Sequence, residues 1–234
     1  MDPLARGGVR RYLDTVKPEE YVPNVGEVNL QEMTLTGLAD LYGSDKGTLK
    51  HNYTVQYEKI INELLAGRSR KSTNLTVCEV GVACGASLRM WGNYLPASKI
   101  IGYDIREECA ELCKDMTNVH IRIEDLCKNT FTEPVDLFID DASHISEHMA
   151  AMFNNAWDAV RSGGYYVIED LACTYNPAYT EQFRKHFDPE VKNNRLAIAA
   201  LLDGLMRMVD SRENVIRIAE IQYHPQMLIL RKFL

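Results

Sequence analysis

Several features are missing from this sequence of 234 residues, and each absence excludes a class of protein. No apolar run approaches the roughly 20 residues that a helix needs to span a bilayer. A basic stripe interleaved with aromatic residues is also missing, and the net charge of −7 disfavours nucleic acid, which needs a basic surface. The N-terminal stretch has no apolar segment of the kind found in secretory signals. We therefore expect a cytoplasmic protein that binds neither nucleic acid nor membrane.

Cysteine pairs spaced C-x-x-C do not occur, although the chain contains six cysteines. The cysteines fall inside apolar runs or expected helices, where reduced and mostly buried thiols are the better interpretation for a domain of this size. Hydrophobic residues make up 46% of the chain and charged residues 25%, an ordinary balance for a globular protein.

The order of apolar patterns along the chain predicts an α/β fold. Residues 1–33 mix charge, proline and glycine without periodicity, whereas residues 34–42 and 53–66 have apolar residues at helical spacing. From residue 75 onward, short β-rich runs alternate with amphipathic stretches. Strands that are apolar on both faces and alternate with helices are typical of a parallel sheet with helices on each side.

Two strand-like runs, NVIRIAEIQY and QMLILRKF, end the sequence and are separated only by His224 and Pro225. So short a link permits an antiparallel hairpin but no parallel crossover. Five β-α units followed by a hairpin are the layout of a class I methyltransferase, a Rossmann-like, doubly wound and mostly parallel sheet. A dinucleotide dehydrogenase would more often continue in parallel.

The first strand, LTVCEVG, opens into the glycine-containing stretch GVACGASLRMW. Ligands of open α/β sheets bind at the carboxyl ends of the strands, beside the first one. Gly81 and Gly85 would allow a tight turn and a close approach of the backbone to a ligand. Glu79 is placed to hold amide or ammonium groups of that ligand. This pattern is a weak signal by itself, because any tight β-α turn resembles it.

Asp104 ends the second strand, 23 residues beyond Gly81, where a carboxylate would accept hydrogen bonds from ribose hydroxyls. The alternative for Asp104 is an N-cap of the following helix. Asp125 ends the third strand and is placed to face an adenine, with a solvated turn as its alternative. A glycine turn with a ribose-binding acid suits both NAD and S-adenosylmethionine, so another feature must separate them.

Acidic residues gather where the fourth and fifth strands end, in FIDDASHISEH and VIEDLAC. The carboxyl ends of adjacent parallel strands meet, so these side chains should converge beside the cofactor: Asp140, Asp141, Glu169 and Asp170. Carboxylates in such proximity raise one another's pKa unless a cation compensates them. Hard oxygen ligands favour Mg²⁺ or Mn²⁺. The alternative is that some of them, or Ser143, cap the next helix.

A second metal motif overlaps this region, because His144, Glu147 and His148 fit the H-x-x-E-H pattern of inverted zinc peptidases. Two histidines at positions i and i+4 of a helix can bind zinc. However, such short motifs arise by chance, and this one follows a buried strand that ends in two aspartates. We therefore disfavour the zinc interpretation.

Four stretches, LADLYGSDKGT…HNYTVQYEKI, EVGVACGASLRMW, FIDDASHISEH and YYVIEDL, together resemble one family. They are similar to the macrolide and rhamnosyl sugar O-methyltransferases of antibiotic biosynthesis, such as the mycinamicin and elloramycin 2-O-methyltransferases. Cephalosporin 7-hydroxylase-like proteins are close relatives of that family. The resemblance runs from about Leu38 to about Asn176. The chain departs from the family at Ala142, where glycine is usual, and at Ala86, where a second glycine precedes Ser87.

The resemblance implies roles for individual residues. Asp141, Glu169 and Asp170 would be metal ligands, and His144 would be the general base. The segment around Tyr53 and Tyr57 would help to close the cofactor site. Together with the interpretations above, the residues expected to bind S-adenosylmethionine are Glu79, Gly81, Gly85, Ser87, Asp104, Asp125 and Asp140.

The expected function is a metal-dependent O-methyltransferase that moves a methyl group from S-adenosylmethionine to a hydroxyl of a small molecule, a sugar on a natural product. Residues 1–70 would form an N-terminal arm and helices covering the cofactor site, and residues 71–234 the methyltransferase domain, in a homo-oligomer. One alternative is an oxidative tailoring protein like the cephalosporin hydroxylases, although no two-histidine, one-carboxylate iron triad stands out. The other is a non-catalytic cofactor-binding protein.

Aromatic residues near the strand ends are candidates for the wall of an acceptor pocket, with plain core packing as the alternative. They are Trp157, Tyr165, Tyr166, Tyr175 and Tyr179.

Overall fold

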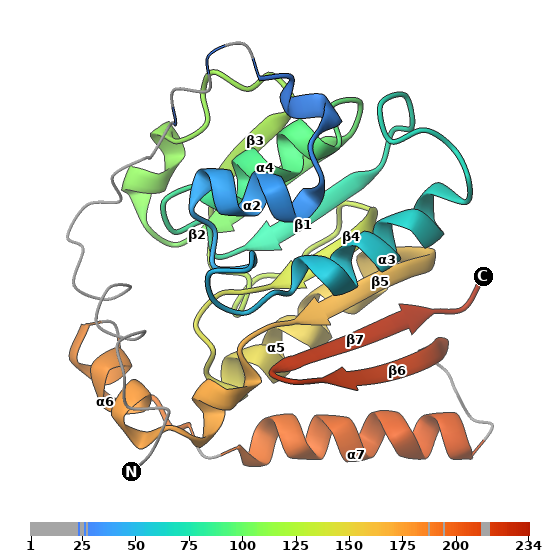
Figure 1. The fold of residues 1–234 in the computed structure, drawn as a ribbon. Helices are drawn as coiled ribbons and strands as arrows, with labels where there is room; N and C mark the ends of the chain where they lie inside the picture. The colour runs from blue at the N-terminus through green and yellow to red at the C-terminus, as the bar shows by residue number, and fades with distance from the viewer. Residues whose placement is uncertain (1–22, 24–25, 27, 187, 194, 212–215) are drawn as a thin grey trace.

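The computed structural model describes residues 23, 26, 28–186, 188–193, 195–211 and 216–234 (Figure 1). Most of the expected N-terminal arm, residues 1–33, lies outside the described residues. The elements follow one another as η2 (Leu30–Glu32), α2 (Leu35–Tyr42), α3 (Thr54–Leu65), β1 (Thr76–Val80), α4 (Ala86–Tyr94), β2 (Lys99–Asp104), η3 (Glu107–Glu111), β3 (Val119–Ile123), β4 (Val135–Asp140), α5 (Ser146–Ala156), η4 (Trp157–Ala159), β5 (Val160–Ile168), η5 (Leu171–Tyr175), α6 (Pro177–His186), α7 (Leu196–Asp210), β6 (Ile218–His224) and β7 (Met227–Lys232).

Within the described residues, seven strands form one sheet in the order β3-β2-β1-β4-β5-β7-β6. Strands β1 to β5 pair in parallel, and β7 pairs antiparallel with both β5 and β6. Only Pro225 and Gln226 separate β6 from β7. The predicted class I methyltransferase fold, with its C-terminal antiparallel hairpin, is therefore confirmed.

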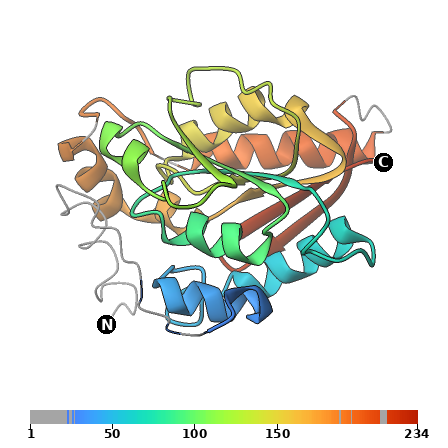
Figure 2. The same cartoon turned by 90° about the horizontal axis from the view of Figure 1, so that it is seen from above.

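Helices cover both faces of the sheet, as Figure 2 shows, with α2, α3 and α4 on one side and α5 and α7 on the other. Alternate residues of each strand supply the two cores. Val77 and Leu137 pack with the first group of helices, and Cys78 and Phe138 with the second. Each fully buried side chain of this kind contributes about 1.5–3 kcal/mol to folding. This burial on both faces explains why the strands read as continuous apolar runs.

The first two helices begin and end close to the predicted limits. Thr34 starts α2 by accepting a hydrogen bond from the Gly37 N–H at 3.0 Å, and Gly43 ends it with a φ of 70°. The segment between α2 and α3 carries Lys46 to the carboxyl edge of the sheet. After β2, the expected helix is replaced by the short 3₁₀ helix η3, and the chain turns at Cys113, where φ is 57°.

Four of the five candidate pocket aromatics are buried in hydrophobic clusters, with Tyr179 8% exposed, and only Tyr175 of the five is exposed. Trp157, Tyr165 and Tyr166 are at most 3% exposed, and the Tyr166 ring stacks on Phe138 with centroids 4.9 Å apart. Their alternative, plain core packing, therefore holds.

No helix in the described part of the chain is long and apolar enough to cross a membrane.

Candidate active site

The loops after β4 and β5 leave the sheet side by side. Asp140 pairs with Ile168 in the parallel register, and the Glu169 N–H donates to the Asp140 carbonyl oxygen at 3.0 Å. The next residues, Asp141 and Asp170, therefore lie together at the carboxyl edge, as the sequence predicts. This edge also receives the glycine turn that follows β1.

Gly81 is required here by packing. Its φ is 102°, and a Cβ at this position would lie 2.1 Å from the Asp141 carbonyl oxygen. Any side chain would therefore push the turn after β1 away from the loop that carries Asp141. The sequence interpretation was that this glycine lets the backbone approach a ligand. In the structure, the close neighbour is the protein's own backbone.

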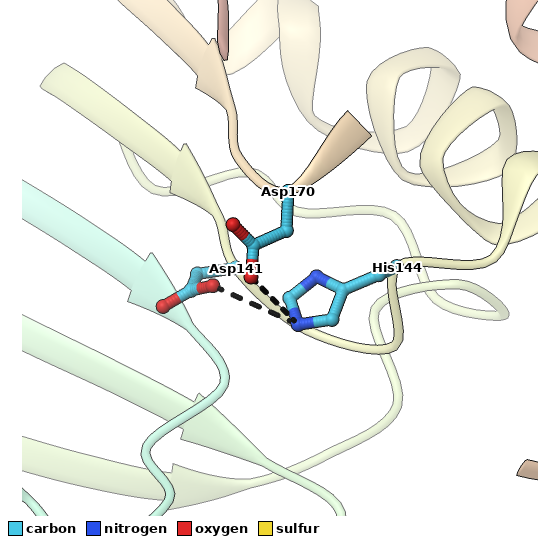
Figure 3. Close-up of side chains that lie close together, drawn as sticks. All are labelled: Asp141, His144 and Asp170. Atoms are coloured by element: carbon cyan, nitrogen blue, oxygen red, sulfur yellow. Dashed lines mark ion pairs between the residues drawn. The ribbon is translucent and has the colours of Figure 1, made fainter. Parts of the chain in front are cut away.

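Asp141, His144 and Asp170 face one another, as Figure 3 shows. The His144 Nε2 lies 3.7 Å from Asp170 Oδ2 and 4.0 Å from Asp141 Oδ1. One donor atom from each residue falls within 4.8 Å of the other two. Neither of these two carboxylate oxygens accepts a hydrogen bond from the described residues. Two carboxylate oxygens left open in this way fit a small divalent cation.

The environment of His144 favours a neutral imidazole. The side chain is 10% exposed, and burial lowers the pKa of the imidazole despite the raising effect of Asp170. Its Nδ1 is buried without a hydrogen-bond partner among the described residues. The backbone is left-handed, with a φ of 51°, which turns the ring toward the two aspartates. A neutral, buried imidazole can accept a proton.

Lys46 is completely buried beside these carboxylates. Its Nζ donates to Asp141 Oδ2 at 2.5 Å and to Glu169 Oε2 at 2.8 Å, and lies 3.7 Å from Glu79 Oε1. Burial would lower the pKa of Lys46, but Asp141, Glu169 and Glu79 raise it well above its ordinary value. The ammonium is therefore charged and provides a fixed internal cation.

Two tyrosines and a histidine from the same N-terminal region contact the other carboxylates. The Tyr53 hydroxyl donates to Asp170 Oδ1 at 2.6 Å, and the Tyr57 hydroxyl donates to Glu169 Oε1. His51 stacks on the Tyr53 ring, with its Nε2 3.8 Å from Asp170 Oδ1. The sequence motif suggested that this segment closes the cofactor site. In the structure, its side chains orient the carboxylates.

The geometry does not support the zinc motif. His144 precedes α5, so it does not share a helix face with His148. The His148 Nδ1 is hydrogen-bonded to Ser143 Oγ at 2.9 Å, and its ring packs against Phe183. The two imidazoles thus have separate surroundings.

At the turn after β1, Glu79 and Ser87 bind each other inside the protein. Glu79 is buried, and its carboxylate accepts hydrogen bonds from the Ser87 hydroxyl and from Trp91 Nε1, the latter at 2.7 Å. The structure thus places both predicted cofactor residues near the turn, with their polar groups already paired. Gly85 follows in a left-handed conformation, φ 81°, and starts α4.

Asp104 ends β2 as predicted, and both of its oxygens are occupied. Oδ2 accepts from the Val82 and Ala83 N–H groups at 3.0 and 3.3 Å, and Arg106 binds Oδ1 through its backbone and side chain. Burial would raise the pKa of Asp104, but hydrogen bonds and the charge of Arg106 lower it below the usual value. Asp104 therefore braces the turn after β1 as well as marking the expected ribose position.

The last two predicted cofactor residues have contrasting environments. Asp125 is half-buried in a turn, where it accepts from the Cys127 N–H at 3.0 Å and pairs with Lys128 at 2.9 Å. These contacts match its alternative, a solvated turn. Asp140 is 2% exposed, and its Oδ2 has no partner among the described residues. Burial raises the pKa of Asp140 to about 7.

Lys46 is the residue of this site that the sequence interpretation missed. It belongs to the stretch GSDKGT, which the resemblance quoted without giving the lysine a role. Its position 95 residues before Asp141 gave no sign of contact. The available signal was a lysine inside a stretch that carries the family resemblance.

Comparisons with known proteins agree with the fold and the motifs. Residues 78–171 match a family described as "Methyltransferase domain". The chain is 33% identical over 185 residues to the 8-demethyl-8-alpha-L-rhamnosyl tetracenomycin-C 2'-O-methyltransferase of Streptomyces olivaceus, covering 73% of this chain and 45% of that protein. It is 30% identical over 164 residues to the mycinamicin VI 2''-O-methyltransferase of Micromonospora griseorubida, covering 63% of this chain and 38% of that one.

A solved structure gives the same result. The MycE methyltransferase from the mycinamycin biosynthetic pathway, in complex with Mg, SAH and mycinamycin VI, superposes with a TM-score of 0.67 at 25% identity. The match covers 87% of this chain and 54% of that one. The chain spans less than half the length of the curated relatives it matches. By sequence and by fold, the chain is similar to the natural-product sugar O-methyltransferases, and its residues 78–171 match the methyltransferase domain.

Proposed function

We propose that this protein is a metal-dependent O-methyltransferase that moves a methyl group from S-adenosylmethionine to a sugar hydroxyl of a natural-product glycoside. The observation that carries the proposal is the convergence of Asp141, His144 and Asp170 at the carboxyl edge of a methyltransferase fold. The relatives named above methylate sugars of this kind, and the solved relative is named in complex with Mg and SAH.

Asp141 and Asp170 would hold Mg²⁺ or Mn²⁺ through the two oxygens that face His144. Glu169 stays the proposed third ligand, although its two oxygens accept hydrogen bonds from Lys46 and Tyr57, one of which the ion would have to replace. When bound, the ion would act as a Lewis acid that makes the acceptor hydroxyl more acidic. The donor set, carboxylate oxygens with a neutral histidine beside them, fits a hard cation better than zinc.

His144 would take the proton from the acceptor hydroxyl. The imidazole is neutral at neutral pH because burial lowers its pKa. The carboxylates of Asp141 and Asp170 would stabilise the imidazolium that forms. The chain must also align the hydroxyl with the methyl group for in-line displacement, which a site built on strand ends can do with little movement.

The turn after β1 and the end of β2 would hold S-adenosylmethionine. Gly81 allows the turn to lie against the loop that carries Asp141, Gly85 lies against Cys113, and Asp104 accepts hydrogen bonds from the turn. For Asp104 to accept ribose hydroxyls, these would replace the Arg106 side chain on its oxygens. Glu79, Ser87, Asp125 and Asp140 stay proposed members of this site.

The division into residues 1–70, which cover the cofactor site, and residues 71–234, the methyltransferase domain, is part of the proposal. The cytoplasmic location and the homo-oligomeric state also stay predictions.

Product analysis tests the function directly. The protein is incubated with S-adenosylmethionine carrying a labelled methyl group, Mg²⁺ and a panel of glycosides and phenols. We expect label on a sugar hydroxyl of a glycoside and none on phenols that lack a sugar. Calorimetry should show binding of S-adenosylmethionine but not of NAD. Binding of NAD without S-adenosylmethionine would refute the proposed function.

A further inference from the structure

A cavity of about 350 Å³ lies between the end of η5, the first turns of α6 and the start of α7. This volume is in the range of small-molecule sites. Among the described residues, its lining carries two arginines and no aspartate or glutamate, in a chain whose net charge is −7. The residues that matter here are Thr174, Tyr175, Asn176, Arg184, Asn193 and Arg195.

Arg195 is held in place entirely by neutral groups. Its Nη1 donates to Thr174 Oγ1 at 3.0 Å, and its Nη2 donates to the Tyr223 hydroxyl at 2.9 Å. The guanidinium also lies over the Tyr175 ring, 4.5 Å from the centroid. No ion pair joins Arg195 to an acidic residue in the described parts of the chain. Within the described residues, its charge is therefore fixed in position without an acidic partner, and no hydrogen bond uses its Nε–H.

Arg184 adds a second positive charge on the same wall. Its Nε donates to the Val191 carbonyl oxygen at 2.7 Å, which orients the guanidinium. Its ion pair with Glu181 is long, 3.6 Å, and the Glu181 side chain is 77% exposed. Exposed pairs of this kind contribute little, so the pair leaves most of the positive field in the cavity.

The cavity wall is joined to the loop that carries His144. Asn193 Oδ1 accepts from the Ser146 N–H at 3.0 Å, and its Nδ2 donates to Thr180 Oγ1 at 3.0 Å. Beside Thr180, the Tyr179 ring lies 5.7 Å from the His144 ring. The first lining residue is Thr174, near the end of η5, the 3₁₀ helix that starts directly after Asp170. A molecule that extends from the catalytic residues along η5 would reach the two arginines.

We infer that this cavity binds an oxyanion, a carboxylate or phosphate group carried by the acceptor at a distance from the hydroxyl that is methylated. Guanidinium groups bind planar carboxylates and phosphates through paired N–H donors, and fixed donors bind more tightly than mobile ones. The inference rests on the proposed function, because it takes the bound molecule to be the methyl acceptor. Binding of the oxyanion can nevertheless be measured without methyl transfer.

Calorimetry on the full chain without S-adenosylmethionine compares three probes and inorganic phosphate. The probes are a methyl glucoside, the matching methyl glucuronide and a glucose phosphate. We expect the glucuronide or the sugar phosphate to bind at least about ten-fold more tightly than the glucoside, as charge-assisted hydrogen bonds imply. The preference should weaken as salt is raised.

Variants locate the site. Arg195→Gln should remove the preference, Arg184→Gln should reduce it several-fold, and Arg195→Lys should keep part of it because the charge remains. Arg207→Gln is the matched control, since Arg207 is an exposed residue of α7 paired with Asp203. Thermal unfolding of each variant separates loss of binding from loss of fold, and Arg184→Gln provides the test if Arg195→Gln does not fold.

The inference is wrong if the neutral and charged glycosides bind equally, or if the preference survives in both arginine variants. Binding of inorganic phosphate alone, with neither charged sugar bound, would show a free-anion site and would also overturn it. Methylation of neutral glycosides without any anion preference would contradict only this inference. Binding of the oxyanion with no methyl transfer to any acceptor would contradict only the proposed function.

Discussion

The two halves of the carboxyl edge of the sheet differ in how their acidic residues are compensated. At β1 and β2, Asp104 is bound by Arg106, two residues away, and by the adjoining turn. At β4 and β5, Asp141 and Glu169 share one buried cation, Lys46, and among the described residues no hydrogen bond reaches one oxygen each of Asp141 and Asp170. Asp104 in the first half is balanced by its neighbours in the sequence. In the second half the carboxylates outnumber the cations, and burial raises the pKa of Asp141 and raises that of Glu169 to about 8.

The difference indicates where each half gets its stability. The β1–β2 half is built from local contacts and should form with the sheet itself. The β4–β5 half depends on Lys46, Tyr53 and Tyr57, which reach it from the segment before the sheet. Substitutions that disturb one half and spare the other can therefore test the comparison.

Removing a carboxylate that faces His144 should have the largest effect. Asp170→Asn keeps the shape and the hydrogen bond from Tyr53 but removes a negative charge from the proposed metal site. We expect methyl transfer to be abolished and Mg²⁺ affinity to fall, while the midpoint of thermal unfolding changes little. Turnover and calorimetric titration with Mg²⁺ measure the two effects. Asp203→Asn, on the exposed side of α7, is the control, and full activity of metal-stripped wild type would refute the metal role.

Replacing His144 should lower turnover without abolishing metal binding. A positioned base contributes about 10²–10⁴-fold, so kcat should fall by that factor. His144→Asn suits the left-handed backbone at this position, where φ is 51°, better than alanine does. His148→Ala should lose much less, because His148 contacts Ser143 and Phe183 instead. If His144→Asn loses Mg²⁺ affinity together with kcat, the histidine is a ligand and not the base.

Lys46→Met should destabilise the β4–β5 half specifically. Removing one partner of a buried ion pair costs about 3–5 kcal/mol, because the remaining charges lose their compensation. Added Mg²⁺ should restore more stability in this variant than in wild type, since the ion replaces part of the missing charge. Thermal unfolding with and without Mg²⁺ measures both effects. Lys59→Met, at an exposed lysine of α3, is the control. Equal stabilisation of wild type and Lys46→Met by Mg²⁺ would show that Lys46 does not balance this site.

Asp104→Asn should act on the β1–β2 half with a smaller effect. The loss of a charged hydrogen-bond acceptor should weaken S-adenosylmethionine binding by about 1–3 kcal/mol. Calorimetry on wild type and variant measures it, with Asp203→Asn, on the exposed side of α7, as the control. An unchanged affinity would mean that Asp104 only braces the turn after β1.

The same variant has a pH signature. The folded-state pKa of Asp104 lies below its unfolded value, so its stabilisation is complete above about pH 4 and is lost as the pH falls through the folded-state pKa. The difference in free energy of unfolding between wild type and Asp104→Asn should therefore shrink in acid. Denaturant unfolding at a series of pH values checks this. A difference that does not change with pH would argue against the pairing with Arg106.

Much of the carboxyl edge could be predicted from the sequence, because a residue that ends a parallel strand must lie at that edge of the sheet. Apolar runs with alternating helices predicted the sheet, and FIDDASH and VIEDL predicted that Asp141 and Asp170 meet. Those conclusions need only the rule that parallel neighbours end at the same edge. The hairpin followed in the same way from a two-residue link.

The sequence by itself determined the order in which strands and helices alternate and the strand ends at which the acidic residues lie. Both are local properties of short segments. The tertiary structure alone decided that Lys46 lies among those acids, that Tyr53 and Tyr57 orient them, and that Gly81 is needed for the approach to Asp141. These contacts join segments that are far apart in the chain. The segments meet only because they pack against the same sheet. Residue types and their spacing in the sequence do not give the distance between two such segments. Only the folded structure therefore specifies which charged groups lie next to one another.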